Sequence, residues 1–364
     1  MSTPEGGEAV NGSAVEGTSP LRKDIDQALG AWVEAEFRPW RTCSLSRSAV
    51  EDGLRNEAKR NGQVCLYRLR EGNVEFAPFM AIHRPFMLDP QHSGGARAHL
   101  YLRHLREVVE AFDIQGSALI GVYVADLHLS RPRAPVFCYQ KRAGDRGLLL
   151  PDVDLLIDNY CDTQDGRYAD QTPFEAKRPQ AIFVGSTTGS ETLTLADVRQ
   201  RTNARLDAAL YFRDEDSVIF ELPSIVQCDH EETRIAIERL GISGRRWSWA
   251  EQQEYRYMLS MDGNGATCSR VAATLHGHQV LAKYASPNLL YYFHGLEPWK
   301  HFVPINEHGD VLDLVSEAGA DFTLHKSIAD QSREFASRFL KREPILRYSA
   351  MLLTRYIQQF GTGR

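Results

Sequence analysis

The sequence lacks most of the short patterns that assign a chain to a function class at sight. Its six cysteines include no CxxC pair, so neither a zinc ribbon nor a thioredoxin-type redox site is supported. It contains no GxxxxGKS/T motif and no GxGxxG motif, which argues against a P-loop and against the common dinucleotide-binding loop. No apolar run approaches the roughly 18 residues of a transmembrane helix. A nucleotide site would therefore have to be built from another kind of loop.

The chain also lacks an excess of positive charge and a signal-like amino terminus. Its 42 basic and 48 acidic residues give a formal net charge of -6, so no nucleic-acid partner is expected. Residues 1–20 are small, polar and acidic, which predicts a disordered tail and not a secretory signal. Together with the scattered cysteines, this favours a cytoplasmic protein with reduced thiols. The 364 residues, 43% of them hydrophobic, suffice for one large domain or two ordinary ones.

What the sequence does contain is an alternation of strand-like and helix-like segments. Apolar residues at helical spacing predict helices over residues 24–37, 48–59, 97–112, 195–210, 248–259, 327–340 and 345–360. Strands are predicted over residues 64–70, 74–79, 118–124, 135–139, 153–157, 181–184, 217–222, 280–283 and 302–305. This alternation favours parallel βαβ units and an α/β fold. A polar crossing at 162–179 separates two predicted domains, 21–165 and 180–340, and a closing helix at 341–364 can pack back on the first.

The stretch SMDGNGATCSR, residues 260–270, is the strongest candidate for a phosphate site. Gly263 and Gly265 flank Asn264, so the backbone there can adopt conformations closed to other residues. Ser269 and Arg270 follow at the start of a predicted helix, where free N–H groups and the positive end of the helix dipole attract anions. Arginine can pair with a phosphate through two hydrogen bonds. The pattern predicts a phosphorylated ligand, most readily a nucleotide.

A second polar loop, Gly185 to Ser190, follows the predicted strand 181–184. Its hydroxyls and backbone N–H groups can face a phosphate or a ribose. The alternative is an ordinary polar turn between a strand and a helix. Three arginines of the next predicted helix, Arg199, Arg201 and Arg205, can supply positive charge where a leaving group gains negative charge, or can be surface residues.

Five aspartates lie near the predicted domain junction: Asp152, Asp154, Asp158, Asp162 and Asp165. A carboxylate in a cleft can act as the general base that deprotonates a hydroxyl, although most loop acids are simply solvated. Asp152-Val153-Asp154 also matches the bare DxD pattern of metal-dependent sugar-nucleotide enzymes. Three-residue patterns carry little weight, and we expect no metal cofactor.

Four blocks of the chain resemble glycosyltransferase family 90. They read LLLPDVDLLI at 148–157, FVGSTTGS at 183–190, YRYMLSMDGNGATCSRVAATL at 255–275 and LEPWKHFVPI at 296–305. That family includes protein O-glucosyltransferases of the secretory pathway, fungal capsule-associated xylosyltransferases and bacterial lipopolysaccharide-modifying glycosyltransferases. The resemblance implies a GT-B arrangement, in which two Rossmann-like domains face each other across a cleft. The second domain would hold a UDP-sugar and the first domain the acceptor.

The resemblance also implies site residues. The expected donor-binding residues are Gly185, Ser186, Thr187, Thr188, Arg205, Asp262, Gly263, Asn264, Gly265, Ser269 and Arg270. The family's eukaryotic enzymes invert the anomeric configuration with an aspartate base just after the LPD block. Here the matching residue is Asp162 or Asp158, with Asp162 favoured slightly. Val184 and Leu290 stand where those enzymes have an arginine and a glutamate, so the donor sugar and ribose contacts can differ.

These inferences predict a bacterial, cytoplasmic glycosyltransferase, free or peripheral at the inner face of the membrane. It would move glucose, xylose or a similar sugar from a UDP-sugar to a saccharide or glycolipid acceptor, such as a lipopolysaccharide core or another envelope glycan. One alternative is a metal-dependent GT-A-like enzyme that uses Asp152 and Asp154. Another is a non-catalytic nucleotide- or glycan-binding protein of envelope assembly.

Overall fold

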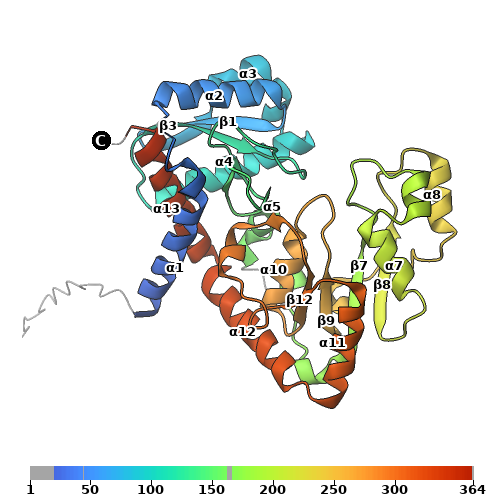
Figure 1. The fold of residues 1–364 in the computed structure, drawn as a ribbon. Helices are drawn as coiled ribbons and strands as arrows, with labels where there is room; N and C mark the ends of the chain where they lie inside the picture. The colour runs from blue at the N-terminus through green and yellow to red at the C-terminus, as the bar shows by residue number, and fades with distance from the viewer. Residues whose placement is uncertain (1–19, 44, 162–165, 363–364) are drawn as a thin grey trace, which may run out of the picture.

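The computed structural model describes residues 20–43, 45–161 and 166–362, which form two five-stranded sheets with helices packed around them (Figure 1). The predicted tail, up to residue 19, lies outside the described residues, as do Asp162 and Asp165. The molecule is a mixed α/β protein with two sheets that contain parallel strands, consistent with a two-domain α/β fold.

The first sheet is mixed and has the strand order β2-β1-β3-β4-β6. Strand β1 (Val64–Arg70) pairs antiparallel with β2 (Asn73–Phe76) and with β3 (Ser117–Tyr123). Strands β4 (Phe137–Cys138) and β6 (Leu148–Leu149) extend the sheet in parallel with β3. The carboxyl ends of β3, β4 and β6 therefore meet at one edge of the sheet.

Helices from both ends of the chain cover this first sheet. They are α1 (Pro20–Phe37), α2 (Arg47–Arg60), α3 (Pro78–His83), α4 (Ser93–Ala111) and α13 (Arg342–Phe360). Figure 1 shows α1 and α13, blue and red, side by side, and the two helices are in contact. Helix α13 also packs on α4 and β3, so the last segment of the chain belongs to the core of the first sheet.

The second sheet is wholly parallel and has the strand order β12-β10-β9-β7-β8. Its strands are β7 (Arg178–Ser186), β8 (Val218–Ser224), β9 (Tyr255–Ser260), β10 (Val280–Tyr284) and β12 (Val303–Ile305). The helices of this half are α6 (Leu195–Gln200), α7 (Ala204–Phe212), α8 (Glu231–Glu238), α9 (Trp249–Gln252), α10 (Cys268–His276), α11 (His308–Ala320) and α12 (Thr323–Phe339). A parallel sheet whose strands alternate with helices is what the alternation in the sequence predicts.

The two halves of the molecule are held together by a strand pairing and by shared core residues. A small antiparallel ladder pairs β5 (Lys141–Arg142) of the first half with β11 (Asn288–Leu289) of the second. The hydrophobic core of the first sheet also takes in Cys268, Val271 and Leu275 from helix α10. A site between the halves therefore has packed walls on both sides.

The predicted helix at 248–259 is wrong in its second part. Helix α9 ends at Gln252, and residues Tyr255–Ser260 form β9, the central strand of the second sheet. Every residue of β9 is buried, so its apolar run shows neither the period of a helix nor that of a half-exposed strand. Periodicity alone cannot separate the two structures in such a run.

The predicted strand at 153–157 is also wrong, because these residues form helix α5 (Val153–Ile157). Asp152 caps the helix: its Oδ1 accepts hydrogen bonds from the backbone N–H groups of Asp154 and Leu155. The predicted helix at 195–210 is two helices, because Arg201 adopts a left-handed conformation (φ 55°) and Asn203 starts a new helix. Helices α8 and α11 were not predicted.

Across the described part of the chain, no helix combines the length and the apolar character that crossing a membrane requires.

Candidate active site

A cavity lies where the carboxyl ends of the two sheets face each other. From the first half, it is lined by Arg97, Asp126, Tyr139, Gln140, Val153 and Asp154; from the second, by Thr188, Arg205, Trp249, Gly263, Asn264, Gly265, Ala266, Thr267, Cys268, Ser269 and Arg270. Most of these residues lie in loops or helix starts that follow β3, β4, β6, β7 and β9. In α/β proteins, ligands bind at this edge, beyond the carboxyl ends of parallel strands.

Arg205 ties the two polar loops of the second half together. Its guanidinium donates to the carbonyl oxygens of Ser186 (3.0 Å), Met261 (2.9 Å) and Asp262 (3.1 Å), and to Thr188 Oγ1 (2.8 Å). Only 6% of the residue is exposed. The side chain thus holds the loop after β7 against the glycine turn after β9.

The position of Arg205 follows from a local signal in the sequence. Asn203 caps helix α7, and its Oδ1 accepts from the backbone N–H groups of Arg205 and Leu206, both at 3.1 Å. The cap places Arg205 in the first turn of the helix, directed at the loops. This residue is therefore an organiser of the site as much as a ligand-facing group.

Arg270 is held less completely than Arg205. One terminal nitrogen donates to the carbonyl oxygen of Val184 (2.6 Å), and the other lies 3.2 Å from Met258 Sδ. The guanidinium lies 4.5 Å from the ring centroid of Phe183 and 5.9 Å from that of Trp249. Its Nε is buried and has no hydrogen-bond partner in the part of the chain that the structure describes. The arginine is in the cavity wall and keeps unused donor capacity.

Neither arginine forms an ion pair with a carboxylate of the described residues. Burial lowers the pKa of Arg205 to about 10, against an opposing effect of Asp262. Burial and the charge of Arg205 lower the pKa of Arg270 to about 9. Burial disfavours the charged form of both arginines, and at Arg270 the nearby charge of Arg205 adds a repulsion. An anion with two phosphate groups would relieve it.

The start of helix α10 already carries an anion from the first half. Asp154, in the first turn of α5, accepts a hydrogen bond from the backbone N–H of Ser269 at 3.1 Å. A carboxylate is favourable at this end of a helix. Ser269 lines the cavity, but its backbone N–H is engaged. Arg270, whose Nε has no partner among the described residues, keeps more donor capacity for a phosphate than Arg205, which already makes four hydrogen bonds.

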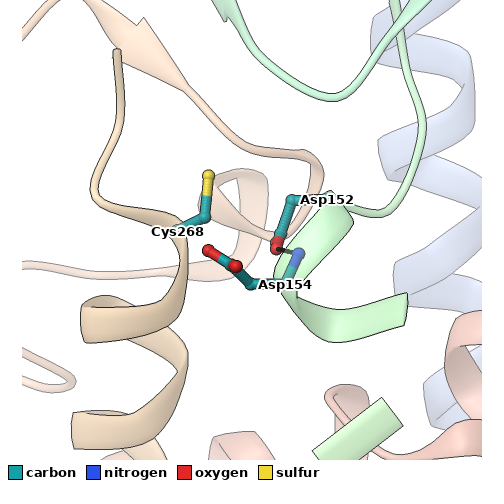
Figure 2. A group of neighbouring side chains, drawn as sticks. All are labelled: Asp152, Asp154 and Cys268. Carbon is teal, nitrogen blue, oxygen red and sulfur yellow. Dashed lines mark hydrogen bonds between the residues drawn. The ribbon is translucent and has the colours of Figure 1, made fainter. Parts of the chain in front are cut away.

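Asp154 also belongs to the group of side chains that could hold a metal. Asp152, Asp154 and Cys268 each offer one ligand atom, and these atoms lie within 4.8 Å of one another (Figure 2). Burial raises the pKa of Asp154, and Asp158 adds to the rise, while Arg167 opposes it.

The first half contributes a network that reaches across to the glycine turn. Arg97 forms an ion pair with Asp126 (2.8 Å), whose Oδ1 also accepts from the hydroxyl of Tyr139 (2.8 Å). The side-chain amide of Gln140 donates to the carbonyl oxygen of Asp126, and its Oε1 accepts from the backbone N–H of Ala266 (2.8 Å). Gln140 therefore fixes the two halves relative to each other at the cavity.

Several expected donor-binding residues lie behind the cavity wall. Gly185, Ser186, Thr187 and Asp262 are not among the lining residues. Thr187 is 1% exposed and bonds the backbone of Val226 in both directions at 2.9 Å. The carboxylate of Asp262 accepts from Ser286 and Asn288. These four residues shape the loops that carry Thr188 and the glycine turn.

The expected base is not placed by the structure. Asp162 lies outside the described residues. Asp158 follows α5, and its Oδ2 is 3.3 Å from a nitrogen of Arg167 and accepts from the hydroxyl of Tyr168 (3.1 Å). It does not line the cavity. The carboxylates that do are Asp126 and Asp154, within the described ranges.

Sequence reasoning missed the contribution of the first half to this site. Arg97, Asp126, Tyr139 and Gln140 of that half carry no motif, and neither does Trp249 of the second half. A weak signal was available for two of them, because Asp126 and Gln140 closely follow the predicted strands 118–124 and 135–139, where α/β proteins place ligand-facing residues.

A second cavity continues from the first and shares Gly263 and Asn264 with it. It is lined mainly by polar residues of both halves, among them Arg60, His128 and Arg142. The two cavities measure about 290 and 540 Å³. Ligand pockets typically measure about 300–1,000 Å³, so the pair has room for two substrates side by side.

Comparison with known proteins places these features in a family. The sequence profile described as "Glycosyl transferase family 90" matches residues 128–362. Protein O-glucosyltransferase 2 of Danio rerio is 23% identical over 272 residues, which cover 71% of this chain and 50% of that protein. Protein O-glucosyltransferase 3 of Homo sapiens is 29% identical over 107 residues, covering 29% of this chain and 21% of the relative.

The chain spans about half, or less, of the length of these curated relatives. The matched profile, in contrast, covers well over half of the chain and includes the glycine turn, both arginines and the polar loop after β7. The resemblance drawn from the four sequence blocks is confirmed. The chain belongs to glycosyl transferase family 90.

Proposed function

We propose that this protein is an inverting glycosyltransferase of GT-B type that moves a sugar from a UDP-sugar to a saccharide acceptor. One observation carries the proposal: Arg205 and Arg270 lie beside a glycine turn, at the facing edges of two sheets, without a carboxylate partner among the described residues. Membership in a glycosyltransferase family supports the same reaction class. The diphosphate of the donor is the anion that such a site accommodates.

In the proposed reaction, the acceptor hydroxyl loses its proton to an aspartate base. The acceptor oxygen then bonds to the anomeric carbon from the face opposite UDP, and the bond from that carbon to the diphosphate oxygen breaks. UDP departs with the electron pair, and Arg270 and the turn at Gly263 to Gly265 stabilise its growing charge. Asp162 is the proposed base and Asp158 the alternative, which would first have to leave Arg167.

The second cavity is the proposed acceptor site, because it opens beside the donor cavity and draws on the first half. Glucose and xylose are the proposed donor sugars. The names of the relatives favour glucose and also raise a protein acceptor as an alternative to a lipopolysaccharide core or another envelope glycan. We propose a cytoplasmic location, at or near the inner membrane face, in a bacterial cell.

The proposal is tested by a thermal-shift screen of the purified protein. A ligand that binds the native state alone raises the melting temperature, so UDP and one UDP-sugar should raise it, whereas NAD, ATP and CMP-sugars should not. Transfer or donor hydrolysis should be lost in Asp162→Asn and, if Asp158 is the base, in Asp158→Asn instead.

Two alternatives predict other results. A GT-A-like enzyme that chelates its donor through Asp152 and Asp154 would lose turnover in EDTA and regain it with Mn²⁺. A non-catalytic binding protein would shift with UDP and show neither transfer nor hydrolysis in any form. A protein that ignores every nucleotide sugar would refute the proposed donor site.

A further inference from the structure

Asp152, Asp154 and Cys268 converge beside the cavity floor, from two different halves of the chain (Figure 2). Asp152 and Asp154 belong to the start of α5, and Cys268 is the first residue of α10. One ligand atom from each side chain lies within 4.8 Å of the other two.

Each carboxylate in the group has one oxygen engaged with the backbone. Asp152 Oδ1 accepts from the N–H groups of Asp154 and Leu155, both at 3.1 Å, and Asp154 Oδ2 accepts from the N–H of Ser269. Asp152 is fully buried, yet its Oδ2 has no hydrogen-bond partner among the described residues. A buried carboxylate oxygen without a partner is unfavourable by a few kcal/mol, so this oxygen favours the binding of a ligand.

The thiol of Cys268 is the third donor. It is 8% exposed, and its Sγ donates to the carbonyl oxygen of Ala266 at 3.4 Å. Backbone contacts orient the two carboxyl groups and leave one oxygen of each to coordinate, whereas the sulfur gives up its bond to Ala266 when the thiol ionises. The three side chains therefore meet the arrangement that a small cation requires.

Two carboxyl groups and a thiol face one another here, so the group can supply up to three negative charges to a cation. The charged side chains that act on Asp154 from outside the group are Arg167 and Arg97, which are positive, and Asp158, which is negative.

We propose that Asp152, Asp154 and Cys268 bind one divalent cation of the zinc class. A thiol selects Zn²⁺ and similar thiophilic ions over Mg²⁺ or Ca²⁺, which prefer oxygen ligands alone. Binding replaces the thiol proton, which is released to solvent. Asp154 and Cys268 line the cavity, so water or a bound anion can complete the coordination from that side.

Such an ion would join α5 of the first half to the start of α10 in the second. It would hold in place the turn that carries Arg270, whether or not the chain transfers sugar. The inference departs from the expectation that no metal is bound, and it differs from donor chelation through a DxD pair, because the thiol is a ligand.

The test is uptake of Zn²⁺ and Co²⁺ by the full chain, purified with chelator and then desalted. Wild type should bind one Zn²⁺ with a raised melting temperature, and Co²⁺ should give the near-ultraviolet charge-transfer absorption of a thiolate ligand. In Cys268→Ala, this absorption should vanish and Zn²⁺ affinity should fall by at least about a hundredfold, since loss of an outer-shell partner alone can weaken a site that far. Cys43→Ala removes a half-buried thiol elsewhere and should behave as wild type.

Asp152→Asn provides the second variant, with a circular dichroism spectrum to check that it folds. It keeps an oxygen to cap α5 and should bind Zn²⁺ as weakly as Cys268→Ala. Two outcomes overturn the proposal. In the first, wild type takes up no stoichiometric Zn²⁺, and the two carboxyl groups share a proton instead. In the second, Cys268→Ala takes up Zn²⁺ as wild type does. UDP binding measured in the same samples keeps this result separate from the fate of the donor site.

Discussion

Replacing Arg270 with alanine separates a catalytic role from a structural one. The guanidinium lies in the cavity wall, donates to the carbonyl oxygen of Val184 at 2.6 Å, and leaves a buried Nε without a partner. A charge-assisted hydrogen bond contributes about 1.5–3 kcal/mol, so its loss to the diphosphate should weaken UDP binding about 10- to 100-fold. Donors that stabilise charge developing in a transition state are worth more, and kcat should fall about 10²- to 10³-fold.

The same substitution should disturb folding much less. It removes one bond to a backbone carbonyl, but it also removes the repulsion between Arg270 and Arg205, which lowers the pKa of the former. The two effects oppose each other, so the free energy of unfolding should fall by less than about 2 kcal/mol. In a chain of this length, that is a melting-temperature change of no more than about 4 °C.

The assay combines isothermal titration with UDP, donor hydrolysis or transfer under saturating donor, and a thermal melt of each variant. Arg201→Ala is the matched control, because its side chain is 56% exposed and lies outside the cavity. It should match wild type in all three measurements. The reasoning fails if Arg270→Ala binds UDP and turns over like wild type, or if it loses both only because it no longer folds.

Three further predictions concern the scaffold of the site. Arg205→Lys cannot make the four hydrogen bonds of the guanidinium, and each carbonyl left without a donor is unfavourable by about 1–3 kcal/mol. Both the melting temperature and the UDP affinity should therefore drop. An unchanged melting temperature would contradict the role of Arg205 in holding the two loops together. Gly265→Ala places a Cβ on the terminal amide of Gln140, which must move away from Ala266, so UDP affinity should fall. Gly309→Ala, with open space at its Cβ, should be neutral in the same titration. Burial lowers the pKa of His104 to about 3, so between about pH 6.5 and pH 3 the unfolded state binds a proton that the folded state does not. The free energy of unfolding of wild type should therefore fall as the pH drops through that range. In His104→Gln, thermal melts over the same range should lack the contribution of this histidine to the pH dependence.

Much of the architecture was predictable because its signals are local. The strand at 64–70 and the helices near 48–59, 97–112 and 345–360 were found within a few residues of their observed bounds. In the helices, apolar residues repeat with the period of one exposed and one buried face, and the strand, which is almost wholly buried, is a short apolar run next to a turn. The glycine turn after β9 and the polar loop after β7 were recognised from their residue types, because glycines and hydroxyl side chains are typical of loops.

The predictions of secondary structure fail where complete burial removes the hydrophobic periodicity, or where a single residue changes the direction of the chain. Strand β9 is buried throughout, so its sequence resembles that of the helix before it. Helix α5 is only five residues long and depends on the cap by Asp152, a short signal inside an apolar run that also suits a strand. The break at Arg201 requires a left-handed conformation that its residue type does not announce.

By itself, the sequence determined the α/β class, the family, the loops that carry Thr188 and Gly263, and the helix start that carries Arg270, because each depends on residues close together in the chain. Only the tertiary structure decided which groups meet across the cavity. Gln140 reaches Ala266 and Asp154 reaches Ser269 over separations of more than a hundred residues, and Arg205 is a buried clamp, not a surface residue. Such contacts depend on how the edges of the two sheets face each other. The spacing of residues along the chain does not by itself show the relative placement of the two sheets.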